Sequence, residues 1–114
     1  MSYQKLNFTF IGKEYPIYFS LGRYRYLNNF AVQMLTDLEF EDAPFGTCTV
    51  NLGISLQDGY AYIDENNLPG ITEWLEKNKL GTRTGSFATS GFCKYELFKF
   101  DLDELRKYTK YERI

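Results

Sequence analysis

The sequence has no histidine, and this absence removes the side chain that most often serves acid–base catalysis near neutral pH. It also removes the imidazole ligands that the two cysteines, Cys48 and Cys93, would need to complete a zinc site. No Gly-Lys-Ser/Thr sequence ends a phosphate-binding loop. We therefore expect a protein that is not an enzyme, with no catalytic residues, no metal site and no cofactor.

Two cysteines in 114 residues are too few for a disulfide framework. Cysteine is a common buried residue, so two reduced thiols in the core are expected. A disulfide between Cys48 and Cys93 is the alternative if the two residues lie on neighbouring strands.

The sequence also lacks a long apolar run and a signal-peptide pattern, so we expect a soluble, cytoplasmic protein without a membrane partner. A chain of 114 residues predicts a single domain over residues 1–114. The net charge is −2, with −6 over residues 1–76 (4 Lys/Arg against 10 Asp/Glu) and +4 over residues 77–114 (9 against 5). Neither part is charged enough to indicate nucleic-acid binding by itself.

Aromatic residues are abundant, with ten Tyr, ten Phe and one Trp. Such side chains favour β-strands and bury large areas in small cores. Period-two alternation predicts an antiparallel hairpin over residues 5–20 with a turn at Gly12-Lys13. Further strands are expected at Phe30–Leu38, where helical spacing is an alternative, and at Phe45–Leu52, Tyr60–Ile63 and Phe92–Phe100.

Two short helices are expected. The first has Asn67 as N-cap, Pro69 in its first turn and Gly81 as a left-handed C-cap. The second begins after Asp101, with Glu104 at the capping-box position, and runs to about Tyr111. The fold class is therefore α+β: a mostly antiparallel sheet of five or six strands with two short helices packed on one face.

The segment Gly81–Gly91 is rich in Gly, Ser and Thr and shows no core-like periodicity, which predicts a long ordered loop. Its Arg83, with Thr84, Ser86 and the freed backbone amides, could hold a phosphate or a partner's carboxylate. The alternative is a loop that only crosses the sheet. We include Arg83, Thr84 and Ser86 among the predicted partner-binding residues.

Asp37–Asp42 packs four acids into six residues. A hairpin loop is one interpretation. The other is a small acidic surface, with Glu39, Glu41 and Asp42 as partner-binding residues, that competes for a basic nucleic-acid channel.

Basic and aromatic residues alternate at Arg23, Tyr24, Arg25 and Tyr26. Such residues can stack on bases or bind phosphates, which predicts a nucleic-acid contact. The same pattern also fits an exposed strand with cross-strand packing.

The segments Leu80–Gly85 and Ser90–Phe100 resemble a family of small proteins with a domain of unknown function, carried on conjugative and phage-like elements of Gram-positive bacteria. Thr49–Leu52 and Asp64–Pro69 extend the resemblance to about residues 30–105, with Glu96 standing where the family pattern has Pro.

Small acidic proteins on such elements resemble inhibitors of host defence, including anti-restriction proteins and anti-CRISPR proteins that act on Cas9. This resemblance implies a non-enzymatic anti-defence inhibitor whose partner is a host nuclease, most specifically Cas9 or its guide-RNA complex. The alternative is a nucleic-acid-binding accessory protein of the mobile element. A structural partner of another protein stays open, as does the oligomeric state.

Overall fold

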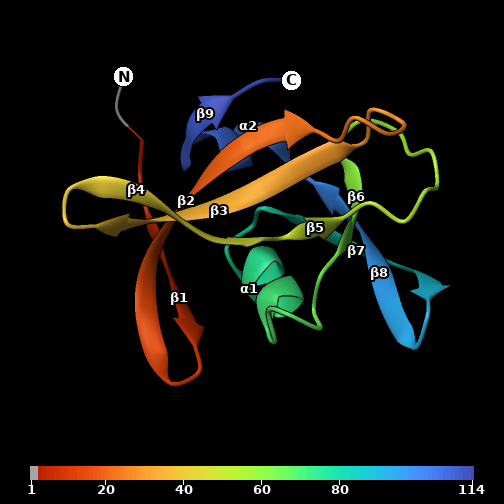
Figure 1. The fold of residues 1–114 in the computed structure, drawn as a ribbon, viewed down its shortest axis with the longest axis horizontal. Helices are drawn as coiled ribbons and strands as arrows, with labels where there is room; N and C mark the ends of the chain where they lie inside the picture. The colour runs from red at the N-terminus through yellow and green to blue at the C-terminus, as the bar shows by residue number, and fades with distance from the viewer. Residues whose placement is uncertain (1–2) are drawn as a thin grey trace.

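The computed structural model describes residues 3–114, which form two β-sheets and two short helices (Figure 1). The first sheet contains β1 (Leu6–Phe10), β2 (Lys13–Arg23), β3 (Phe30–Leu38), β4 (Glu41–Thr47) and β9 (Thr109–Glu112). The second contains β5 (Thr49–Val50), β6 (Tyr60–Ile63), β8 (Cys93–Phe100) and β7 (Gly81–Ser90), in that spatial order. The helices are α1 (Ile71–Lys77) and α2 (Leu102–Arg106).

All strand pairs in the described residues are antiparallel except β2 with β9, which is parallel. The α+β class is therefore confirmed. The structure adds β7 and β9 to the strands expected from the sequence. Among residues 3–114, no helix combines the length and hydropathy that crossing a membrane requires.

The core lies between the two sheets and α1, and aromatic rings fill much of it. Phe98 and Phe100 of β8 contact each other edge to face, and Phe100 reaches Phe30 of β3 in the same way. The helix contributes Ile71 and Leu75, both fully buried. Side chains from the two sheets therefore bury one another, as two-layer packing requires.

The first hairpin is confirmed. β1 pairs with β2 from Leu6 opposite Ile17 to Phe10 opposite Lys13, so the turn is Ile11-Gly12, one residue before the predicted position. Phe30–Leu38 is a strand, as expected. The predicted strand Phe45–Leu52 is divided at Cys48, where the chain passes from the first sheet to the second.

The prediction of a loop over Gly81–Gly91 is wrong, because Gly81–Ser90 forms the edge strand β7, which pairs with β8. Its side chains are mostly exposed, so no hydrophobic face marks it in the sequence. Backbone hydrogen bonds to β8 hold it in place, with a bulge between Arg83 and Phe87. Glu96 lies in β8, which pairs with β6 on one side and with β7 on the other, so it is not in an edge strand.

The boundaries of the first helix also differ from expectation. α1 begins after Gly70, which has the left-handed φ of 87°, and not after Asn67. The carboxylate of Glu65 accepts hydrogen bonds from the Thr72 amide (3.0 Å) and hydroxyl (2.7 Å), so a distant side chain caps the helix. At the other end Lys79, and not Gly81, is left-handed, with φ of 62°.

The second helix ends at Arg106 and not near Tyr111. Residues Thr109–Glu112 become β9 because the edge of β2 offers free backbone groups, and Arg106 binds Glu112 at 3.0 Å. Cys48 and Cys93 are free thiols, as expected. Cys48 is fully buried in the core, but Cys93 is only half-buried, so the prediction that both thiols lie in the core is wrong for Cys93.

Candidate binding surfaces

Arg83 turns back onto its own sheet. Its Nε and Nη2 donate to Glu96 Oε1 at 2.9 and 2.7 Å, and Glu96 is 8% exposed. The other carboxylate oxygen accepts the Gly85 amide at 3.3 Å. A carboxylate removed from water in this way needs a cation. Arg83 therefore has a structural partner inside the chain.

Thr84 and Ser86 also make hydrogen bonds within the bulge of β7. The Thr84 hydroxyl donates to the Leu97 carbonyl at 2.6 Å and accepts the Ser86 amide at 3.1 Å. Arg83, Thr84 and Ser86 thus belong to one network that holds the edge strand, and their role in partner binding stays a prediction.

Within the acidic segment Asp37–Asp42, some carboxylates pair with other residues of the chain and others do not. Asp37 pairs with Lys5. Asp42 accepts hydrogen bonds from Tyr18 and Tyr111 and pairs with Lys110, whose Nζ lies 3.0 Å from both carboxylate oxygens. Only Glu39 and Glu41, at the turn between β3 and β4, stay fully available to a partner.

Asp42 links β9 to β2 and β4. Hydrogen bonds from Tyr111, Tyr18 and Lys110 lower the pKa of its carboxyl to about 2. Burial and the nearby carboxylate of Asp42 raise the pKa of the Tyr18 phenol, which is neutral at physiological pH. The cluster holds the carboxylate charged and the phenol protonated.

This cluster predicts a pH dependence of stability. Because the folded pKa of Asp42 is lower than its ordinary value of 3.8, the carboxylate stabilises the fold above that value. Its contribution is lost as pH falls from 3.8 to about 2. Urea denaturation of the wild type and Asp42→Asn across this range should give free energies of unfolding that converge at the acid end. A constant difference would contradict the assignment.

In two hairpin turns, a residue with a large apolar side chain has a left-handed backbone conformation. Ile11 has φ of 49° and is 87% exposed, and Phe40 has φ of 72° and is fully exposed. Both turns have two residues with positive φ, the geometry that Asn-Gly normally fills. Leu38, next to the second turn, is 63% exposed.

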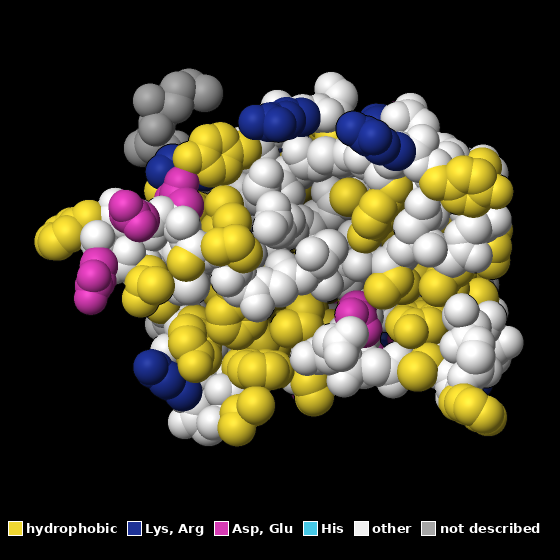
Figure 2. Space-filling view, in the orientation of Figure 1, with side chains coloured by type: hydrophobic (Ala, Val, Ile, Leu, Met, Phe, Trp, Pro, Cys, Tyr) yellow, Lys and Arg dark blue, Asp and Glu magenta, His cyan; other side chains and the backbone are white. Residues whose placement is uncertain are grey.

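A partly exposed aromatic cluster joins the two hairpins. Phe45 of β4 packs against Phe10 and Tyr15 of the β1–β2 hairpin, with ring centroids 5.6 and 4.8 Å apart. Hydrophobic side chains gather over this half of the molecule in Figure 2. We call this surface the hairpin face, made of Phe10, Ile11, Tyr15, Leu38, Phe40 and Phe45.

The residues Arg23–Tyr26 do not form one surface. Arg23 binds Asp58 at 2.9 Å and the Asn28 carbonyl at 3.1 Å. The Tyr24 hydroxyl lies 2.9 Å from both the Thr49 carbonyl and its hydroxyl. Arg25 and Tyr26 lie in the following turn and are exposed.

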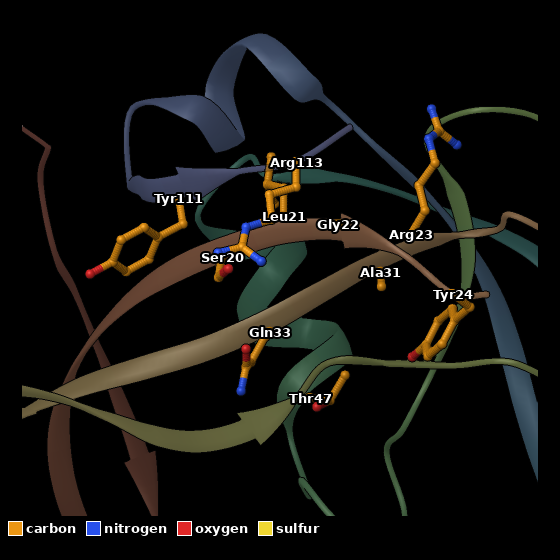
Figure 3. A pocket seen from close by; sticks show the side chains of 10 residues that line it. All are labelled: Ser20, Leu21, Gly22, Arg23, Tyr24, Ala31, Gln33, Thr47, Tyr111 and Arg113. Atoms are coloured by element: carbon orange, nitrogen blue, oxygen red, sulfur yellow. The ribbon is translucent and has the colours of Figure 1, made fainter.

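A groove crosses the outer face of β2, β3 and β4 beside these residues (Figure 3). It has a volume of about 490 Å³ and no acidic residue in its lining. Arg23 and Tyr24 line one end, and Tyr111 and Arg113 of the C-terminal segment line the other. We call it the β2–β3 groove.

A family model for a domain of unknown function, DUF4313, matches residues 19–113. The chain belongs to this family. No curated protein and no solved structure matches the chain. The matched range of the DUF4313 domain includes the turn at Phe40 and the whole β2–β3 groove, while Ile11 lies before it.

Sequence reasoning did not select Ile11, Phe40 or Arg113 of this DUF4313 chain as a candidate binding residue. Ile11 precedes Gly12 in a two-residue turn, which is a signal that the residue would be exposed. Phe40 sits inside an acidic run, where the predicted binding surface consists of the charged neighbours alone. Arg113 follows the end of the predicted second helix, and no local pattern indicated that it would reach the β2–β3 groove. Among residues 3–114, no group of three potential ligands gathers to hold a metal ion.

Proposed function

We propose that the protein is a non-enzymatic inhibitor that binds a host defence nuclease on behalf of a mobile element, with Cas9 or its guide-RNA complex as the most specific candidate. One observation supports this proposal most. The two turns of the hairpin face hold exposed apolar side chains, Ile11 and Phe40, in a backbone conformation that such residues disfavour.

The fold gains little from these two side chains. A non-glycine residue in the left-handed region costs about 1–2 kcal/mol, and an exposed ring returns no burial energy. Burying either side chain against a partner would contribute about 1.5–3 kcal/mol. Strain at exposed positions is therefore typical of residues retained for a contact.

The charges beside Phe40 suit a basic partner. Glu39 and Glu41 flank the ring and have no ion pair within residues 3–114. A basic surface of a nuclease, such as one lining a nucleic-acid channel, complements an apolar tip between two carboxylates. The link to mobile elements and to Cas9 rests on the family resemblance, and a Cas9 partner would put the protein in the cytoplasm.

The proposal predicts that two variants are more stable than the wild type but inhibit Cas9 cleavage less. Ile11→Asn creates an Asn-Gly turn, and Phe40→Gly relieves the strained second position, so each should raise the free energy of unfolding by about 1 kcal/mol. Each should also raise the concentration needed to inhibit Cas9 cleavage by about tenfold or more, as expected for an interface hot spot. Denaturation and a cleavage assay measure the two effects.

A matched control is available at a third hairpin. Phe92 is also fully exposed in a two-residue turn, between β7 and β8, but it lies outside the hairpin face. Phe92→Ser should leave inhibition unchanged. If Ile11→Asn and Phe40→Gly inhibit as well as the wild type, the hairpin face is not the docking surface.

The order of addition separates the modes of inhibition. Inhibition only when the protein is added before guide loading would indicate action on the guide RNA or its assembly. Inhibition after loading would indicate blocked DNA entry or nuclease action. No inhibition in either order would contradict the Cas9 assignment.

The alternative function, a nucleic-acid-binding accessory protein of the mobile element, ranks second. Of its predicted contact residues, Arg23 pairs with Asp58 in the free protein, so a phosphate would have to displace Asp58, and the Tyr24 hydroxyl bonds to Thr49. Arg25 and Tyr26 stay exposed in a turn and keep this alternative testable.

A further inference from the structure

The floor of the β2–β3 groove is hollow because small residues face each other across two strands. Gly22 of β2 pairs with Ala31 of β3, and a Cβ atom added at Gly22 would have no heavy atom within 4 Å. Ser20, Gln33 and Thr47 line the rest of the floor. Tyr24 and Tyr111 stand at opposite ends (Figure 3).

The groove presents polar groups that the fold itself does not use. The backbone of Arg113 is fixed by a hydrogen bond from its amide to the Leu21 carbonyl at 2.9 Å, and its guanidinium lies over the floor in Figure 3. No ion pair within residues 3–114 involves Arg113. A free guanidinium above hydroxyl and amide groups is suited to bind a phosphate.

We propose that the β2–β3 groove binds single-stranded nucleic acid, with Arg113 on a phosphate and the exposed ring of Tyr111 available to a base. Arg23 at the rim supplies a second cation, which Asp58 holds in the free protein. Sheet surfaces that combine aromatic rings with a basic groove are typical of single-strand binding. A groove of about 490 Å³ admits a nucleotide or two but not a duplex. This inference concerns a second surface and does not depend on the hairpin face.

Gly22 offers a test that leaves the fold intact, because it is outside the left-handed region and faces open space. Gly22→Glu places a negative charge on the floor, whereas Gly22→Gln adds nearly the same volume without charge. A fluorescent oligothymidylate or oligouridylate of about 16 nucleotides serves as the probe at low salt. We expect Gly22→Glu to weaken binding about tenfold more than Gly22→Gln does.

Salt dependence tests the arginines directly. Two phosphate contacts to a single strand predict a slope of log K against log salt of about −1.4, and Arg113→Gln should reduce its magnitude by about 0.7. Asp58→Asn releases Arg23 and should tighten binding. The control for Arg113→Gln is Lys77→Gln, which also removes one positive charge but lies on α1. It should leave the slope of log K against log salt unchanged.

Four results would overturn the proposal. The first is no binding of either oligonucleotide at low salt. The second is equal binding by Gly22→Glu and Gly22→Gln. The third is tighter binding of duplex than of single strand. The fourth is a loss of affinity with Lys77→Gln as large as that with Arg113→Gln. Because none of these measurements involves Cas9, they stay informative whether or not the protein inhibits it.

Discussion

Replacing Gly81 with alanine should destabilise the protein by about 3 kcal/mol, near the upper end for overpacking. A Cβ atom at this position would overlap the Lys99 carbonyl oxygen and the ring of Phe98, and it would lie 2.9 Å from the Phe100 Cα atom. Two of these three atoms belong to the backbone of β8, which cannot move without breaking its pairing with β6. The Phe98 ring is fully buried and has no room to turn aside.

Denaturation by urea measures this effect, and Gly22→Ala is the matched control. Gly22 is also a glycine in a strand, but its added Cβ would meet open space. We expect Gly22→Ala to change the free energy of unfolding by less than about 0.5 kcal/mol, as most surface substitutions do. Similar losses for the two variants would show that glycine flexibility, and not close approach, explains Gly81.

Arg83→Ala should destabilise the protein by about 2 kcal/mol, because it leaves the buried carboxylate of Glu96 without its cation. The estimate lies below the value for fully buried pairs because the Arg83 side chain is 46% exposed. A loss of activity in Arg83→Ala therefore has to be compared with the loss of stability before it is assigned to a missing partner contact. Urea denaturation measures the loss.

A second variant distinguishes the ion pair from general packing. If Arg83 acts through Glu96, then Arg83→Met combined with Glu96→Leu should recover most of the lost stability, since replacing both partners by apolar residues removes the unpaired charge. Additive losses in the double variant would contradict a coupled pair.

Local patterns predicted those parts of the fold whose signals are themselves local. The alternation of Leu6–Phe10 and Tyr15–Leu21 predicted the first hairpin, and the mixed pattern at Phe30–Leu38 was correctly assigned to a strand. The Asp101 cap was also correct, since its side chain accepts the Glu104 amide at 3.2 Å. The predicted partner-binding residues differ in their contacts: Glu39 and Glu41 are exposed beside Phe40, whereas Asp42 and Arg83 have internal partners that local sequence patterns do not reveal.

Local sequence signals were sufficient to predict the α+β class and the acidic turn between two strands, and the composition excludes chemistry that needs histidine. Pairing between distant segments, and not a local signal, makes Gly81–Ser90 a strand, because an exposed edge strand is held by backbone hydrogen bonds to its neighbour and needs no apolar pattern. Such pairing also joins Thr109–Glu112 to β2 and not to a helix, so that Tyr111 and Arg113 come to lie beside residues about 90 positions earlier in the β2–β3 groove. Long-range pairing of this kind leaves no trace in local periodicity, because it depends on which strand edge is free once the rest of the chain has folded.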